Sequence, residues 1–248
     1  MHQWADEALI LAVDKFGDHD AIVHVFTPAQ GLARGVVKRG LTRKQRPDMQ
    51  PGSLVQVQWK ARLEQHMGTI TLEAKHGYAT RVMHDPLRLA ALGSAVSLLR
   101  ATLAEHDPHP ELYLALHHFL QYVAAGVAPL TWLSEYARLE LAVLELAGFG
   151  LDLSGCAATG QTHDLVYVSP KSGRAVSRAA GLPYHDRMLA LPAFLATTHA
   201  ADDSAELLQG LALTGQFLET RLLPELHRAM PPLRSHFISL IQRQTIAA

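Results

Sequence analysis

The hydrophobic pattern of the chain changes near residue 80, from the two-residue period of strands to the longer period of helices. Before that point five short runs are rich in apolar or β-branched residues, at 8–13, 21–27, 31–38, 54–60 and 69–75. In the fourth run, Val55, Val57 and Trp59 alternate with polar residues, which is typical of a strand with one buried face. Five short strands predict a small closed or half-closed barrel, because a lone meander has too little core. A five-stranded barrel of this length is what an OB-fold requires.

After residue 80 the spacing becomes mainly helical. Apolar residues recur every three or four positions in five stretches, at 86–105, 111–126, 130–148, 204–223 and about 233–242. Proline stands at or just before the start of the first three, a favourable place because its missing N–H would be unpaired there. We therefore expect five helices in this part of the chain.

An irregular insert interrupts the helical part at about 151–195. It is rich in Gly, Ser and Thr and has one strand-like piece, at 165–169. The fold class predicted is α+β multidomain: an N-terminal five-stranded OB-fold β-barrel over residues 1–80, then an α-helical domain over 81–248 that carries the insert.

Composition narrows the class of protein. The chain has 248 residues, of which 48% are hydrophobic and 18% charged, a globular balance rather than a disordered one. No stretch of 18 apolar residues predicts a membrane span, and the N-terminus lacks the basic and apolar regions of a signal peptide. The single cysteine, Cys156, cannot form an internal disulfide. The cytoplasm is the compartment that these features favour.

The net charge is only −1, but positive charge gathers in one segment, RGVVKRGLTRKQR at residues 34–46. It holds six basic side chains and no acidic one: Arg34, Lys38, Arg39, Arg43, Lys44 and Arg46. Surfaces that serve only solubility usually mix the two signs, and small barrels commonly bind nucleic acid on one face and its bordering loops. The segment therefore predicts a DNA-contacting strand and loop. The alternative is a solvated loop.

The size of the expected electrostatic effect follows from the number of charges. If all six met phosphates, the log–log salt slope on single strands would be about −4.

Three residues near the end of the fourth run extend this prediction. Lys60 and Arg62 either widen the positive face or guard a strand edge, as lysines do in many sheets. Trp59 could stack on a base, but its phase with Val55 and Val57 favours a place in the core.

No catalytic or metal-binding motif stands out. The chain lacks GxSxG, the phosphate loop and a dinucleotide fingerprint, so no catalytic residue is predicted. Asp18, His19 and Asp20 fall between two expected strands, where aspartate and glycine are ordinary turn formers. His117 and His118 are adjacent on an expected helix and point about 100° apart, so they do not favour a shared metal ion.

Several phrases resemble the RecO family of bacterial recombination mediators in order and spacing. They cover essentially the whole chain: FGDHDAIVHVFTPAQGLARGVVKRG, PGSLVQVQW, MGTITLEAK, LELAGFGLDLSGCAATG and VSPKSGRAVSRAAGLPY. The resemblance implies binding of single- and double-stranded DNA, annealing of complementary strands, and recombinase loading in RecF-pathway recombination. The implied partners are RecR and the single-stranded DNA-binding protein. No enzymatic activity and no cofactor are implied.

The insert departs from the family pattern. Many members carry a four-cysteine zinc knuckle there, as two CxxC pairs, whereas this chain has Cys156 and Thr159 in the first pair and Ser177 and Ala180 near the second. Structural zinc needs about four soft nitrogen or sulfur ligands. We therefore expect a degenerate knuckle without metal, held by packing and hydrogen bonds.

A second function stays open beside DNA binding. With its neutral charge and lost cysteines, the chain could be a protein-interaction adaptor with little DNA affinity. Five aromatic residues of the helical part are expected mostly in the core, and an exposed groove among them would suit a partner's short tail: Tyr113, Phe119, Tyr122, Trp132 and Tyr136.

Overall fold

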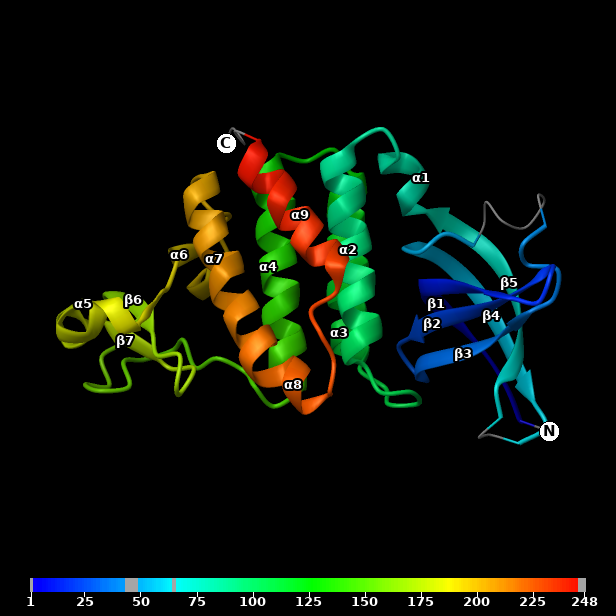
Figure 1. The fold of residues 1–248 in the computed structure, drawn as a ribbon, viewed down its shortest axis with the longest axis horizontal. Coiled ribbons are helices and arrows are strands. Elements are labelled where there is room, and N and C mark those ends of the chain that lie inside the picture. Colours follow the sequence, from blue (N-terminus) through cyan, green and yellow to red (C-terminus); the bar gives the residue numbers. More distant parts are fainter. Residues whose placement is uncertain (1, 43–48, 64–65, 245–248) are drawn as a thin grey trace. The chain divides into compact units, whose positions relative to one another are not determined.

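The computed structural model describes residues 2–42, 49–63 and 66–244 (Figure 1). The contacts within the chain divide it into two compact units. The first unit comprises Met1–Gly126 with Pro231–Arg234, and the second comprises Val127–Met230 with Ser235–Ala248. The first unit thus contains three helices as well as the strands. The division at residue 80 that the sequence predicts follows the change from strands to helices, and it stays a prediction about domains.

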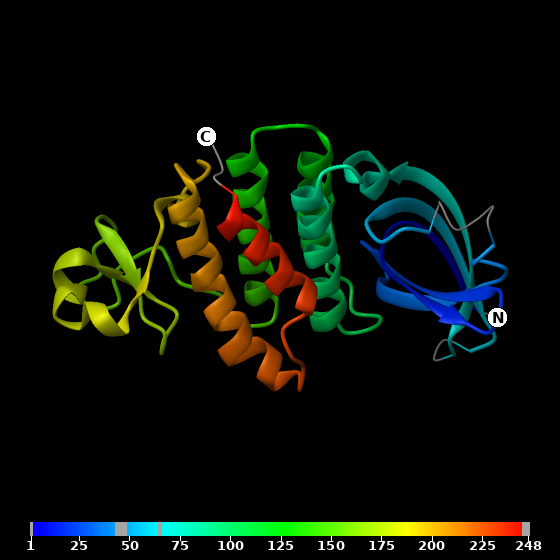
Figure 2. The same ribbon diagram turned by 45° about the horizontal axis from the view of Figure 1, so that its top comes forward.

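Five strands open the first unit, as the sequence predicts, and they form an OB-fold-like closed barrel in the order β1-β2-β3-β5-β4 (Figure 2). They are β1 His2–Phe16, β2 Asp20–Thr27, β3 Gly31–Val37, β4 Ser53–Ala61 and β5 Gly68–Gly77. All neighbours pair antiparallel except β3 and β5, which are parallel.

The first strand is much longer than the predicted run at 8–13. Its first half pairs with β4, from His2 to Leu9, and its second half pairs with β2, from Leu9 to Phe16. A register shift between Ile10 and Ala12 lies where the strand passes from one partner to the other. The first half of β1 is polar and has no hydrophobic run that would predict a strand. It is a strand because it pairs with β4.

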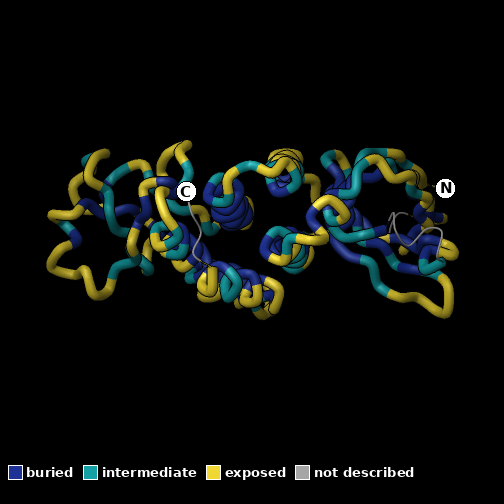
Figure 3. The backbone as a smooth tube through the Cα atoms, turned by 90° about the horizontal axis from the view of Figure 1, so that it is seen from above, coloured by how far each residue is buried: buried dark blue, intermediate teal, exposed yellow. Residues whose placement is uncertain are grey.

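The barrel interior is filled by alternate residues of each strand, so buried and exposed positions mix along the strands (Figure 3). Trp59 is 2% exposed, which confirms its predicted place in the core. Its Nε1–H donates to the Arg34 carbonyl oxygen at 3.1 Å, and its ring stacks on Trp4 with 5.8 Å between centroids. Trp59 therefore joins three strands, β1, β3 and β4.

Three helices complete the first unit: α1 Tyr78–Val82, α2 Pro86–Thr102 and α3 Pro110–Ala124. The Asp85 carboxylate caps α2 by accepting hydrogen bonds from the Leu87 and Arg88 N–H groups. Pro86 and Pro110 occupy the first helical positions, as predicted. The short helix α1 was not predicted, because five residues are too few for a helical period to be recognised.

The second unit is built mainly on helices. They are α4 Pro129–Leu146, α6 Ala193–Ala196, α7 Ser204–Phe217, the π-helical η3 Leu218–Leu222, α8 Leu223–Glu225 and α9 Pro232–Arg243, whose first turn belongs to the first unit. The helices α4 and α7 pack together, and there the Thr214 hydroxyl donates to the buried Glu140 carboxylate. Trp132 and Tyr136 are buried, and the Tyr136 ring lies 4.7 Å from Phe237.

The single helix predicted at 204–223 is divided in the structure. After α7 the backbone widens into the π-helical η3 and returns to α-helix at Leu223. Pro224 follows immediately and has no N–H to donate to residue 220, so a regular ladder would lose one bond here. Within the described residues, no helix combines the length and the apolar content needed to cross a membrane.

The insert holds more regular structure than predicted. Besides β6 Leu165–Val168, where the sequence predicts a strand, it contains β7 Ala175–Ser177 and β8 Leu189–Ala190, in the sheet order β7-β6-β8. A short helix α5 Arg178–Gly181 and a 3-10 turn η2 Leu182–Arg187 connect β7 to β8. Strands of two or three residues carry too little alternation to be found from the sequence.

We expect Gly68→Ala to destabilise the first unit. A Cβ on Gly68 would lie 2.4 Å from the Trp59 ring and 2.8 Å from the Lys60 carbonyl oxygen. Overpacking of a filled core costs about 1–3 kcal/mol, and chemical unfolding followed by tryptophan fluorescence measures it. Gly93→Ala is the matched control, because its Cβ would meet nothing closer than 3.5 Å. Equal stability of the two variants would contradict the close packing at Gly68.

Candidate nucleic-acid interface

Lys60 and Arg62 lie together at one end of the barrel. Because Trp59 points inward, the next residue, Lys60, points outward, and its side chain is exposed. Lys60 pairs with Thr69 of β5 on one side and with Gln3 of β1 on the other. Arg62 follows directly after β4 and is also exposed.

These two cations line an open depression of about 510 Å³. Its other lining residues are Ala61, His66, Met67, Gly68 and Thr69. Within the described residues neither Lys60 nor Arg62 forms an ion pair. Within the described part of the chain their charges therefore have no acidic partner and can meet an anion.

The described part of the basic segment is placed differently. Arg34 lies on the outer face of β3, and its guanidinium pairs with Glu105 at 3.0 Å. Lys38 pairs with Asp20 at 2.9 Å. Although the segment itself holds no acid, distant parts of the chain supply carboxylates to two of its cations.

Asp20 also fixes the backbone at the start of the loop. The Arg39 N–H donates to Asp20 Oδ1 at 2.8 Å, and Arg39 has a positive φ of 54°. The Arg39 N–H, followed by the Lys38 ammonium, lowers the pKa of Asp20 below its ordinary value. Asp20 therefore holds the segment that leads towards the loop as an ionised carboxylate.

Three of the predicted DNA-binding residues, Arg43, Lys44 and Arg46, lie outside the described residues. The structure therefore brings together Lys60 and Arg62, pairs Arg34 and Lys38 with acidic residues, and bonds the Arg39 N–H to Asp20. The assignment of all eight residues to DNA stays a prediction.

The turn predicted at GDHD is confirmed. Residues 17–19 form the turn between β1 and β2, Gly17 has a φ of 63°, and the His19 carbonyl oxygen accepts a hydrogen bond from the Leu41 N–H at 3.0 Å. Gly17, Asp18 and His19 therefore make the connection between two strands, and Asp20 begins β2.

The adjacent histidines of α3 have separate roles. His117 Nε2 is 2.9 Å from the Tyr78 hydroxyl, and the His118 ring packs against Tyr122. Among the described residues no group of three or more His, Cys, Asp or Glu side chains is arranged to hold a metal ion.

The knuckle positions do not fit a structural zinc ion. Cys156 is buried, and its thiol sulfur lies 3.4 Å from the Ser177 hydroxyl and 3.3 Å from the donating Ser177 N–H. Hydrogen bonds from Ser177 and then Thr159 lower the pKa of the Cys156 thiol to about 6. Three of the four positions where many family members are expected to carry cysteines thus form a hydrogen-bonded cluster around one sulfur, and the fourth, Ala180, offers only a methyl group. One thiol is too few for tetrahedral zinc.

Comparison with known proteins gives consistent matches over the chain. A family model described as Recombination protein O N terminal matches residues 1–78, and one described as Recombination protein O C terminal matches residues 83–229.

Full-length relatives agree with the family models. A protein of Rhodospirillum centenum named DNA repair protein RecO is 43% identical over 95% of this chain and 93% of its own length. A protein of the same name from Rhodospirillum rubrum is 40% identical over 100% of this chain and 99% of its own length. A third protein of this name, from Dinoroseobacter shibae, is 43% identical over 98% of this chain and 99% of its own length.

The geometry of the knuckle predicts that the protein folds without zinc. Metal analysis of the purified protein should find well below one zinc per chain, and a chelator should leave the melting temperature unchanged, because no thiolate–metal bonds stabilise the fold. Stoichiometric zinc, with a chelator-induced loss of stability, would contradict this arrangement.

Proposed function

Since the chain belongs to the RecO family and is similar along its whole length to DNA repair proteins of that name, we propose that it binds DNA non-specifically through one end of its barrel. A role in DNA repair and recombination is what its relatives support. The observation that carries the proposal of DNA binding is the depression at Lys60 and Arg62, where two exposed cations have no acidic partner within the described chain.

The chemistry of such a site is electrostatic. Each ammonium or guanidinium that meets a phosphate releases counterions from the DNA, which favours binding at low salt. Two strands held against the same cations repel each other less, so complementary bases can pair. No bond is made or broken in this process, which agrees with a mediator family that is not known for enzymes.

The proposal extends to the loop at residues 39–46 and to partners. Arg43, Lys44 and Arg46 would add phosphate contacts for single and double strands, together with Arg34, Lys38 and Arg39. Recombinase loading in RecF-pathway recombination would follow from contacts with RecR and with the single-stranded DNA-binding protein.

The adaptor function has one observation in its favour. Acidic partners neutralise Arg34 and Lys38, which reduces the positive charge available to DNA. The five aromatic side chains of the helical part do not support the exposed groove that an adaptor would need. Four of them are buried, and the fifth, Tyr122, is half-buried against His118. Binding to DNA that weakens as salt is added would favour the DNA-binding function. Absent or salt-independent binding would favour the adaptor.

We expect the double variant Lys60→Ala/Arg62→Ala to bind a labelled single strand more weakly, with a log–log salt slope smaller by about 1.4, because two phosphate contacts are lost at roughly 0.7 each. Fluorescence anisotropy across a salt series measures both quantities. The control is Lys15→Ala/Lys171→Ala, which removes two exposed cations elsewhere. The proposal fails if the wild-type protein does not bind, or if both double variants lose the same affinity.

The loop is tested by annealing. Replacing Arg43, Lys44 and Arg46 with alanine should slow the pairing of two complementary labelled strands, because repulsion between their phosphates is less well neutralised. Fluorescence quenching during annealing follows the rate, with the same control variant. Annealing at the wild-type rate would remove the loop from the proposed site and leave Lys60 and Arg62.

A further inference from the structure

The outer face of β2 and β3 is the face that OB-folds commonly present to nucleic acid, but in this protein α3 and the α2–α3 connection cover the part of it at Phe26 and Leu32. Phe26 of β2 is fully buried, with its ring centroid 5.8 Å from that of Tyr113 on α3. The Leu32 carbonyl oxygen of β3 accepts a hydrogen bond from the His106 N–H at 2.9 Å. DNA crossing these two strands would have to displace such contacts.

The outer face of β4 and β5 is open instead. Gln58 pairs with Thr71, and Lys60 pairs with Thr69, and all four side chains are exposed. Amide and hydroxyl groups can hydrogen-bond to phosphate and sugar without selecting a sequence. One carboxylate, Glu73, lies on this face, so the cations that offset it must lie at the ends of the strand pair.

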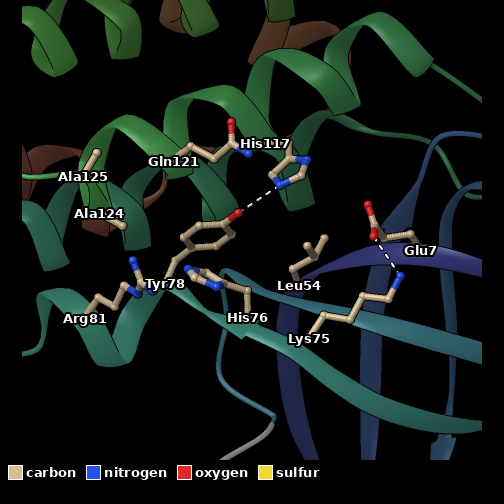
Figure 4. Close-up of a pocket in the computed structure, with 10 residues that line it drawn as sticks. All are labelled: Glu7, Leu54, Lys75, His76, Tyr78, Arg81, His117, Gln121, Ala124 and Ala125. Carbon is tan, nitrogen blue, oxygen red and sulfur yellow. Dashed lines mark hydrogen bonds and ion pairs between the residues drawn. The ribbon is translucent and has the colours of Figure 1, made fainter.

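A second pocket lies at the opposite end of β4 and β5 from Lys60 (Figure 4). It has a volume of about 490 Å³, and its wall combines the end of β5, helix α1 and helix α3 of the first unit. The lining residues that the argument uses are Glu7, Lys75, His76, Tyr78 and Arg81.

The charge of this pocket favours an anion. The Glu7 carboxylate accepts hydrogen bonds from the Lys75 ammonium at 2.9 Å and from the Tyr113 hydroxyl at 3.3 Å. The Lys75 hydrogen bond is the largest cause that lowers the Glu7 pKa, so the carboxylate is ionised and paired. Arg81 is exposed and forms no ion pair within the described ranges, which leaves one uncompensated cation at the pocket.

The pocket also offers a ring on which a base can stack. The His76 ring is half-buried, with its centroid 4.4 Å from that of Tyr78. The Tyr78 hydroxyl is in turn 2.9 Å from His117 Nε2, which holds the tyrosine in place (Figure 4). Stacking on such rings is insensitive to base identity and is available only from an unpaired strand.

We propose that this pocket receives one nucleotide of single-stranded DNA, with its phosphate at Arg81 and its base against His76. The strand then runs along β4 and β5 to Lys60 and Arg62, not across β2 and β3, so a DNA contact of Arg34 on the outer face of β3 would lie outside this path. This path rests on the proposed DNA binding, and it assigns the pocket at His76 and Arg81 to single-stranded DNA.

The length of the path fits a small barrel. Leu54, at the pocket, and Lys60 are six residues apart on β4, which is about 20 Å at roughly 3.3 Å per residue. About six stacked nucleotides span that distance at roughly 3.4 Å each, within the range of about 4–16 that one OB-fold covers.

Photocrosslinking maps the path directly. A twelve-nucleotide thymidine strand with 4-thiothymidine at alternate positions is irradiated with the full-length protein, and crosslinked peptides are identified by mass spectrometry. Crosslinks in residues 75–81 together with residues 58–69 are expected. Crosslinks confined to β2, β3 and the α2–α3 connection would overturn the path.

Variants of the pocket give an independent readout. Arg81→Ala should weaken binding of the same strand about tenfold at low salt, as for the loss of one charged hydrogen-bonded contact, and reduce the salt slope by about 0.7. His76→Ala should lose affinity, whereas His76→Phe, which keeps a ring, should retain it. Lys15→Ala is the matched control, and circular dichroism confirms that each variant is folded.

The outcomes separate this inference from the proposed function. If the wild-type protein shows no salt-dependent binding, both fail. If binding depends on Lys60 and Arg62, but Arg81→Ala and His76→Ala bind as the wild type does, the path along β4 and β5 fails alone.

Discussion

Closure of the barrel depends on a short parallel contact between β3 and β5. Only two residue pairs join these strands, Gly35 with Gly68 and Val36 with Thr69. A Cβ on Gly35 would lie 2.8 Å from Ile70, and one on Gly68 would enter the Trp59 ring, so this seam is close because both residues are glycine. The rest of the first unit follows from the seam, since without it β4 and β5 would not curve round to meet β3.

The seam also determines where the cations lie. Because β4 ends beside the start of β5, Lys60 and Arg62 lie near Gly68, whereas Lys38 follows the last residue of β3 and meets Asp20 of β2. Cations that are adjacent to acids stabilise the connections of the barrel. Lys60 and Arg62, which have no acidic partner among the residues that the structure describes, stay available to a ligand. This division follows strand register and not the local density of positive charge.

Much of the fold could be predicted from local pattern, but the ion pairs could not. The alternation of Val55, Val57 and Trp59 gives both the strand β4 and the inward side of the tryptophan, and the prolines before the helices give their first turns. Lys38 meets Asp20 because Val37 pairs with Ala21, and Arg34 meets Glu105 through a connection 71 residues away in sequence. The pocket at His76 and Arg81 brings together β1, β4, β5, α1 and α3, and no motif spans such distances.

The hydrogen-bonded sulfur of Cys156 frees the knuckle from the supply of a metal. A four-thiolate site fails when zinc is scarce, and oxidants attack its exposed thiolates and release the ion. Here one buried sulfur is hydrogen-bonded to Ser177 instead. For a protein of a DNA repair family, this ties the packing of the knuckle to one buried sulfur and not to a set of four thiolates.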